Sequence, residues 1–122
     1  MERVPKDEER EERIANEAVV DAYGPEEQAI GWYTYLDQWL HFPFRAKCIS
    51  ERLSSPLRLG TTVEVSNMAP EDECERDIFV VIRWGDRDPA VPLAQLAPLR
   101  VDADTAQAIG DWHYWVARSY TF

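Results

Sequence analysis

The sequence is short of cysteine and has no long apolar run. Its two cysteines, Cys48 and Cys74, are too few for a disulfide scaffold and lack the paired spacing of a zinc site. We expect two reduced thiols, with a single bridge between them as the alternative. No apolar run reaches the ~18 to 20 residues of a membrane-spanning helix, and the charged N-terminus lacks the apolar centre of a signal peptide. These absences predict a cytoplasmic protein with no membrane partner.

Basic residues are also scarce. The 122 residues include 13 lysines and arginines against 23 aspartates and glutamates, which gives a net charge of −10. A field of this sign repels nucleic acid and anionic membrane and attracts cations. The hydrophobic fraction of 45% is that of a globular chain. The length predicts one domain over residues 1–122, in which the mixed charge run 1–13 is a frayed start.

The motifs of catalysis and phosphate binding are missing. Neither His41 nor His113 has a partner marked by a nucleophile motif, and there is no glycine-rich phosphate loop. His113 stands in an aromatic cluster and is expected to serve packing, whereas His41 can meet free carbonyls at a helix end. Paired carboxylates in an open loop lack the pocket that would separate their pKa values. We therefore expect a protein that is not an enzyme.

Helical periodicity occurs in the first third of the chain. It predicts one helix over residues 7–23 and a second from Pro25 to about His41, separated by the helix-breaking pair Gly24-Pro25. Asp37 falls near the end of the second helix and faces away from its apolar stripe. A carboxylate there meets the negative end of the helix dipole, and a bound cation would reverse that penalty.

The middle of the chain changes to a period of two, and its end returns to helix. A third helix is predicted from a cap at Asp102 or Asp104 to Arg118, with Gly110 indicating close approach by another element. Leu96 and Leu99 are expected to tuck beneath the sheet. Four strands are predicted before them, the third covered on both faces, over residues 44–51, 62–66, 78–84 and 90–93. The fold class is thus α+β: a small curved antiparallel SH3-like sheet of four or five strands, packed with two N-terminal helices and one C-terminal helix.

The densest charge lies between the second and third predicted strands. Five carboxylates and one arginine occupy the seven residues from Glu71 to Asp77. Two carboxylates ~6 Å apart repel by roughly 3 kcal/mol near a protein surface. A calcium ion, which takes about six to eight oxygen ligands in flexible geometry, would neutralise such a loop. No EF-hand spacing fits the chain, so a calcium site would be of another design, and a merely solvated loop in an interaction module is the alternative.

Several short motifs occur together in a distinctive order. Their combination resembles the small bacterial calcium-binding family without EF-hands that is typified by a cyanobacterial protein linked to heterocyst differentiation, the CcbP-like family. The resemblance covers about residues 14–120. It is carried by Gly31-Trp32, Tyr35-Leu36-Asp37, Phe42-Pro43-Phe44-x-Ala46-x-Cys48, Met68-Ala69-x-Glu71-Asp72-Glu73-Cys74, Val91-Pro92-Leu93-x-Gln95-Leu96 and Asp111-Trp112-His113-Tyr114-Trp115.

This resemblance implies a compact α+β domain that binds calcium through loop carboxylates and an aspartate near a helix end. The helix aspartate corresponds to Asp37, and calcium is expected to gather a loose loop onto it. Asp86 and Asp88 are weaker candidates for a second site, and Arg45, Lys47 and Arg76 reduce the negative potential. The loop ligands correspond to Glu71, Asp72 and Glu73, with Glu75 and Asp77 as further candidates.

Two functions follow as hypotheses. The first is a calcium buffer or sensor, and a sensor would have a calcium-dependent protein partner. The second is an SH3-like interaction module whose acidic loop binds a basic partner.

Overall fold

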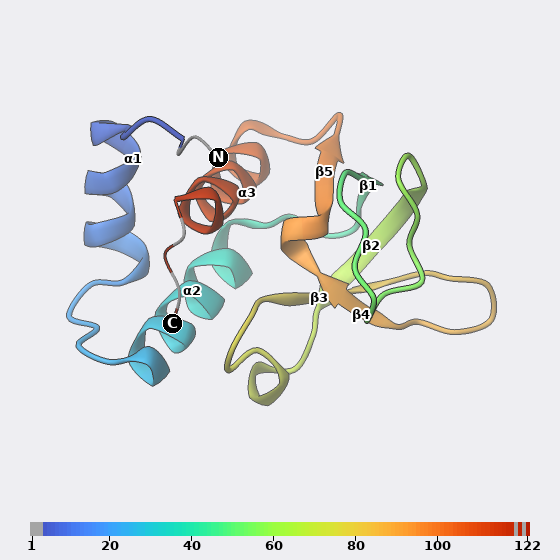
Figure 1. Ribbon diagram of the computed structural model, residues 1–122, viewed down its shortest axis with the longest axis horizontal. Helices are drawn as coiled ribbons and strands as arrows, with labels where there is room; N and C mark the ends of the chain where they lie inside the picture. Colours follow the sequence, from blue (N-terminus) through green and yellow to red (C-terminus); the bar gives the residue numbers. More distant parts are fainter. Residues whose placement is uncertain (1–3, 119, 121) are drawn as a thin grey trace.

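The computed structural model describes residues 4–118, 120 and 122. Helices gather on one side of the molecule and strands on the other (Figure 1), which confirms the α+β class. The helical elements are α1 (Glu8–Arg13), the π-helical turn η1 (Ile14–Ala18), α2 (Pro25–Trp39), the short 3-10 turns η2 (Glu71–Glu73) and η3 (Leu93–Gln95), and α3 (Ala103–Ala117). The strands are β1 (Phe44–Cys48), β2 (Thr62–Met68), β3 (Phe79–Ile82), β4 (Ala90–Pro92) and β5 (Leu96–Leu99).

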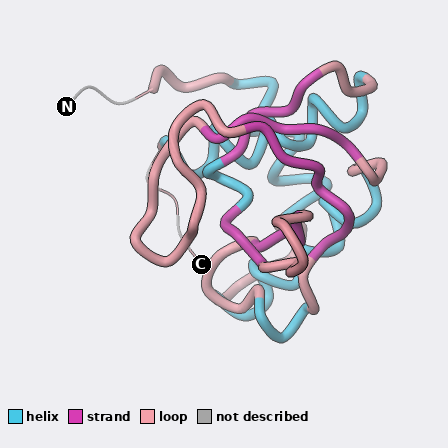
Figure 2. Tube along the Cα trace, turned by 90° about the vertical axis from the view of Figure 1, so that its right-hand side faces the viewer, coloured by secondary structure: helices cyan, strands magenta, loops and turns pink. Residues whose placement is uncertain are grey.

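All neighbouring strands are antiparallel, and the sheet is open with the order β4-β3-β2-β1-β5. The strands curve along their length in the side view (Figure 2). Two expectations are wrong. β3 is not covered on both faces, because its residues alternate between half-buried and buried, and the centre of the sheet is β2. Leu96 and Leu99 do not tuck beneath the sheet, since they belong to β5, which pairs with β1.

A β-bulge in β2 determines which of its last residues are buried. Val63 and Val65 are buried at alternate positions, and the pairing with β3 then shifts register between Val65 and Asn67. An extra residue of this kind moves the buried positions by one. Met68 and the following Ala69 are therefore both in the core, and β2 extends beyond the predicted end at residue 66. The chain from Glu71 to Asp77, called the acidic segment below, thus follows two buried residues, Met68 and Ala69.

The core between α2 and α3 is built from indole rings. Trp32 lies 5.0 Å from Trp112 and 5.5 Å from Trp115, measured between ring centroids. Tight packing also joins η1 to α2, because a Cβ at Gly31 would clash with the carbonyl oxygen of Ala18. The first predicted helix, expected to continue to residue 23, ends as a helix at Ala18.

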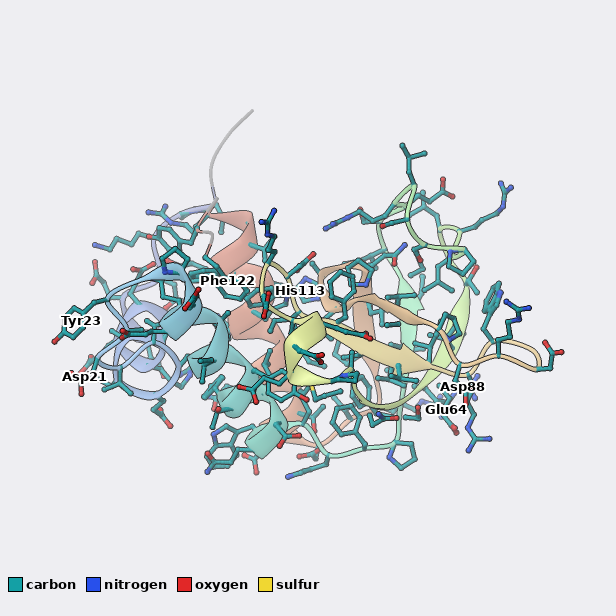
Figure 3. All side chains as sticks on the ribbon, turned by 90° about the horizontal axis from the view of Figure 1, so that it is seen from below. Asp21, Tyr23, Glu64, Asp88, His113 and Phe122 are labelled. Carbon is teal, nitrogen blue, oxygen red and sulfur yellow. The ribbon has the colours of Figure 1, made fainter. Side chains whose placement is uncertain are left out.

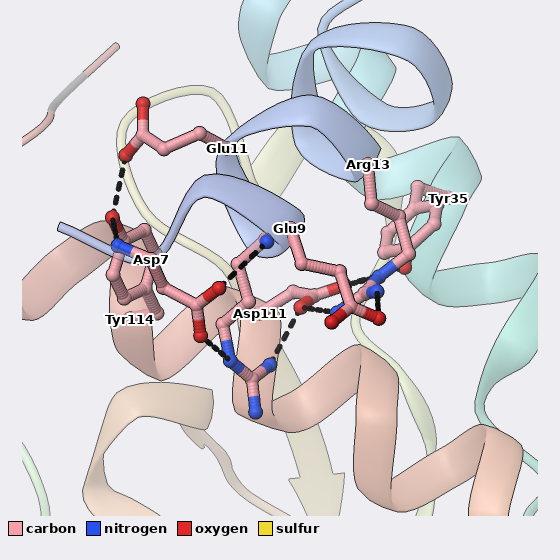
Figure 4. Close-up of polar contacts among 8 residues, drawn as sticks. Asp7, Glu9, Glu11, Arg13, Tyr35, Asp111 and Tyr114 are labelled. Carbon is pink, nitrogen blue, oxygen red and sulfur yellow. Dashed lines mark hydrogen bonds and ion pairs between the residues drawn. The ribbon is translucent and has the colours of Figure 1, made fainter.

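Asp111 is fully buried on α3 and is the centre of a polar network. Its Oδ1 accepts hydrogen bonds from Arg10 Nη1 (2.6 Å) and Arg13 Nη2 (2.7 Å), and its Oδ2 accepts from Arg13 Nε (2.9 Å) and the Tyr35 hydroxyl (2.7 Å). Figure 4 shows α1 held across α3 in this way. The hydrogen bond to Asp111 raises the pKa of Arg13. The pKa of Tyr35 is also raised, mainly by burial and then by its hydrogen bond to the same carboxylate.

Polar contacts hold α1 in place, since none of its residues is buried. Residues 1–3 of the expected frayed start lie outside the described residues, whereas Glu8–Arg13 is helical and capped by the side chain of Asp7. The close approach expected at Gly110 is made by Arg10, whose Nη1 would lie 3.0 Å from a Cβ there.

The cysteines and His113 have structural positions. Cys48 and Cys74 are both free and buried. His113 Nε2 lies 2.6 Å from the carbonyl oxygen of Leu96, so its ring joins α3 to the start of β5. No helix within the described residues has the length and hydropathy needed to cross a membrane.

We predict that Asp111→Asn lowers the free energy of unfolding by about 3 kcal/mol, because it leaves two guanidinium groups without their buried counter-charge. Denaturant titration measures this change. Glu9→Gln is the matched control, since Glu9 is exposed and lies 3.9 Å from Arg13 Nη1, and a surface pair of this kind contributes about 1 kcal/mol or less. Equal stability of the two variants would contradict the role given to Asp111.

His113 predicts a pH dependence of stability. Burial lowers its pKa, although the bond to the Leu96 carbonyl acts in the opposite direction. The unfolded chain therefore takes up a proton near the ordinary histidine pKa of about 6.5, at which the native state stays neutral. Stability is present above that pH and is lost as the pH falls through it. His113→Gln should flatten the fall in melting temperature between about pH 7 and pH 5.5, and an unchanged fall would contradict this role of His113.

Candidate metal centre

The backbone of the acidic segment is fixed at both of its ends. At its start, the amide of Ala69 donates to the Phe79 carbonyl (3.1 Å), and the Ala69 carbonyl accepts from the Tyr33 hydroxyl (2.7 Å). At its end, Ile78 is fully buried and its carbonyl accepts from the amide of Leu93 (2.9 Å). The expected loose loop is therefore a turn that backbone hydrogen bonds close at both ends.

Cys74 fixes the middle of the segment. Its amide donates to the Glu71 carbonyl (3.0 Å), which closes η2, and its buried thiol accepts from the Phe79 amide (3.4 Å). Burial raises the pKa of this thiol, and the charges of Asp77, Glu73 and Asp72 raise it further. The cysteine thus turns inward and leaves its acidic neighbours at the surface.

Asp77 differs from the other carboxylates of the segment because it is half-buried. Its Oδ1 accepts from the amide of Ile78 (2.8 Å), and its Oδ2 lies 3.9 Å from Arg52 Nη1. Burial raises the pKa of Asp77, against the lowering effects of these two groups. One of its oxygens is therefore already engaged by the backbone, whereas the other carboxylates are exposed, namely Glu71, Asp72, Glu73 and Glu75.

Tyr33, in the middle of α2, contacts the start of the acidic segment through the bond from its hydroxyl to the Ala69 carbonyl. Burial raises the pKa of its hydroxyl, and the charges of Asp37, Glu71 and Asp72, together with Cys74, raise it further. Asp37 stands one helical turn after Tyr33 on the same face of α2. Three of the predicted ligands therefore add to the negative potential at one phenol. Glu73 and Asp77 act instead on the Cys74 thiol.

A groove of about 940 Å³ lies between the start of α2 and the acidic segment. Figure 3 views the molecule from below, with Phe122 beside the start of α2. The wall from α2 and the wall from the segment both contribute carboxylates, and the rest of the lining is largely apolar. The lining residues are Pro25, Glu26, Ala29, Ile30, Glu71, Asp72, Cys74, Glu75, Arg76 and Phe122.

A different cluster has the tightest arrangement of potential ligand atoms. Within the part of the chain that the structure describes, only His41, Asp102 and Asp104 place three such atoms within 4.8 Å of one another. Residues 61 positions apart meet here, which no sequence spacing could indicate. Asp102 already accepts from the amide and hydroxyl of Thr105 and lies 2.8 Å from His41 Nδ1. It caps α3, where the positive end of the dipole opposes a cation, so we interpret the cluster as a helix cap.

The weaker candidates for a second site lie in a different turn. Asp86 and Asp88 are exposed in the turn between β3 and β4. Figure 3 shows Asp88 at the opposite end of the molecule from the connection that carries Asp21 and Tyr23. His41 also departs from expectation, because its ring meets the Asp102 carboxylate.

The link between Tyr33 and the acidic segment gives a third prediction. Tyr33→Phe removes the donor to the Ala69 carbonyl and should cost about 1 kcal/mol of stability. Hydrogen exchange should accelerate mainly in the amides of residues 69–74, since local opening becomes easier. Tyr23→Phe is the control, because Tyr23 is 88% exposed. Unchanged exchange in the Tyr33 variant would remove this hydroxyl from the anchoring of the segment.

Comparison with known proteins places the chain among relatives. Residues 12–116 match the CcbP protein family, which is described as calcium binding. The crystal structure of Anabaena CcbP is 45% identical over the full length of both chains, with a TM-score of 0.87. A structure described as a calcium-binding protein in the calcium-binding form is 43% identical over the full length of both, also with a TM-score of 0.87. A search of curated proteins gave no significant match. The chain belongs to the CcbP family of calcium-binding proteins, a family of binding proteins and not of enzymes.

Proposed function

We propose that calcium binds where the end of α2 meets the acidic segment, with Asp37, Glu71 and Asp72 as its principal ligands. The observation that supports this set is the bond from the Tyr33 hydroxyl to the Ala69 carbonyl at the start of the acidic segment, because Asp37 lies one helical turn after Tyr33 on the same face of α2. The three side chains are exposed, so their oxygens are free to rotate toward an ion. Glu73 and Glu75 are further candidate ligands, and Asp77 offers its second oxygen.

Calcium fits this donor set better than magnesium does. The ligands are carboxylate oxygens on an irregular turn and a helix end, and calcium accepts such variable geometry, whereas magnesium requires a near-octahedral shell and retains its waters. Because the segment lacks preorganising asparagine and glycine, the affinity falls in the sensor range or weaker, about 10⁻⁶ to 10⁻⁴ M.

Binding at this place would move side chains more than backbone. The segment is already closed by the bonds of Ala69, Cys74 and Ile78, so a calcium ion relieves repulsion without folding a new element. The arrangement suits a buffer, and it suits a sensor only if a partner responds to the change in charge. The two functions expected from the sequence, calcium binding and binding of a basic partner at the acidic surface, are therefore compatible.

Calorimetric titration at constant ionic strength tests the ligand set. Asp37→Asn and Glu71→Gln should each raise the calcium dissociation constant about tenfold, which corresponds to about 1.4 kcal/mol. Asp104→Asn is the control and also tests the rival cluster near His41. Unchanged affinity in Asp37→Asn, or lost affinity in Asp104→Asn, would contradict the proposed site.

A further inference from the structure

The groove beside the candidate calcium site combines acidic walls with an apolar floor. Glu26 lies on the wall from α2, and Glu71, Asp72 and Glu75 lie on the opposite wall, where Arg76 is the one basic residue of the lining. Four carboxylates against one guanidinium leave this concave surface strongly negative. Walls of one charge sign concentrate ligands of the opposite sign.

Apolar side chains make the same groove more than a charged surface. Ile30 is 53% exposed although it lies between buried residues of α2, and it lines the groove together with Ala29, Pro25 and Phe122. An exposed apolar surface bordered by polar residues is typical of a protein interaction site. A small hydrated cation gains nothing from it, but the side chain of a peptide does.

We propose that this groove binds a basic protein segment that carries an apolar anchor residue, and that calcium displaces it. The anchor contacts Ile30 and Phe122, and lysines or arginines on either side reach Glu26 and the carboxylates of the acidic segment. Charge complementarity selects this occupant, because the net charge of −10 disfavours nucleic acid and anionic membrane.

The displacement follows from shared residues and rests on the proposed calcium site. Glu71 and Asp72 line the groove and are also proposed calcium ligands. A carboxylate that coordinates calcium is no longer available to a lysine or arginine, so the two ligands oppose each other. By linkage, the peptide weakens calcium binding by the same factor by which calcium weakens peptide binding.

The direct test uses a fluorescent lysine–leucine amphipathic peptide and anisotropy titration of the full chain in EDTA. The peptide should bind, and matched peptides with serine for leucine or glutamate for lysine should bind much more weakly. Equal binding of the serine peptide, or no binding of the lysine–leucine peptide, would overturn the proposal. Sedimentation in EDTA addresses a second copy as occupant: a dimer that Ile30→Ser dissociates would also overturn it.

Variants locate the peptide in the groove. Ile30→Ser should weaken the peptide about tenfold through lost apolar burial, and Glu26→Gln about threefold. Glu27→Gln is the matched control, because Glu27 is adjacent on α2 but does not line the groove. Its Oε2 accepts from the Tyr23 amide, which the glutamine oxygen can still do. Equal effects of Glu26→Gln and Glu27→Gln would show binding by general charge and contradict the assignment.

The calcium arm separates the two proposals. Saturating calcium should weaken binding of the peptide about tenfold, more than magnesium does at equal ionic strength. Asp37→Asn should raise the calcium concentration needed to displace the peptide. If calcium binds without affecting the peptide, displacement is wrong and the calcium site stands. If calorimetry shows no calcium binding, the calcium site and displacement both fail, and peptide binding in EDTA still decides whether the groove is a docking site.

Discussion

Like charges on the segment from Glu71 to Asp77 repel one another, and the fold opposes that repulsion by fixing the backbone beneath them. Ala69, Cys74 and Ile78 are buried. Ala69 and Cys74 are hydrogen-bonded to Phe79 of β3, and Ile78 is hydrogen-bonded to Leu93 of η3. The repulsion therefore cannot be relieved by opening the turn without breaking these contacts. It remains as a local potential that a cation lowers, and this potential connects the fold to calcium binding.

A buried charge organises the helical side of the molecule. Asp111 accepts hydrogen bonds from both arginines of α1 and from Tyr35 of α2, so three helices share one carboxylate. Such a centre fixes the rotation of α2 about its axis, because Tyr35 must face α3. Tyr33 then faces the acidic segment, where its hydroxyl donates to the Ala69 carbonyl, and Asp37 lies one helical turn further along the same face. The network around Asp111 thus helps to place the helix aspartate of the candidate site.

Local sequence signals predicted the helices and strands, whereas contacts between distant residues determined the strand pairing, the register and the buried polar network. The Gly24-Pro25 break and the Asp102 cap fixed the starts of α2 and α3, and the charge pattern marked the acidic segment. The register shift in β2 and the pairing of β5 with β1 depend on contacts between distant residues. The same is true of Asp111, which resembles any helical aspartate in the sequence, and of the bond from the Tyr33 hydroxyl to the Ala69 carbonyl. The pairing of Asp37 with the loop carboxylates came from the family resemblance and not from spacing, and it stays a prediction.

The sign of any coupling between calcium and a basic partner follows from how the negative charge is distributed. Calcium sensors that open an apolar groove show positive coupling, because the ion stabilises the conformation that the partner needs. Here the groove already exists without an ion, and the backbone beside it is closed. What calcium changes is the number of free carboxylates, and a basic ligand needs those same groups. Two cationic ligands that share anions at fixed positions compete, so in this fold calcium would act by releasing a partner.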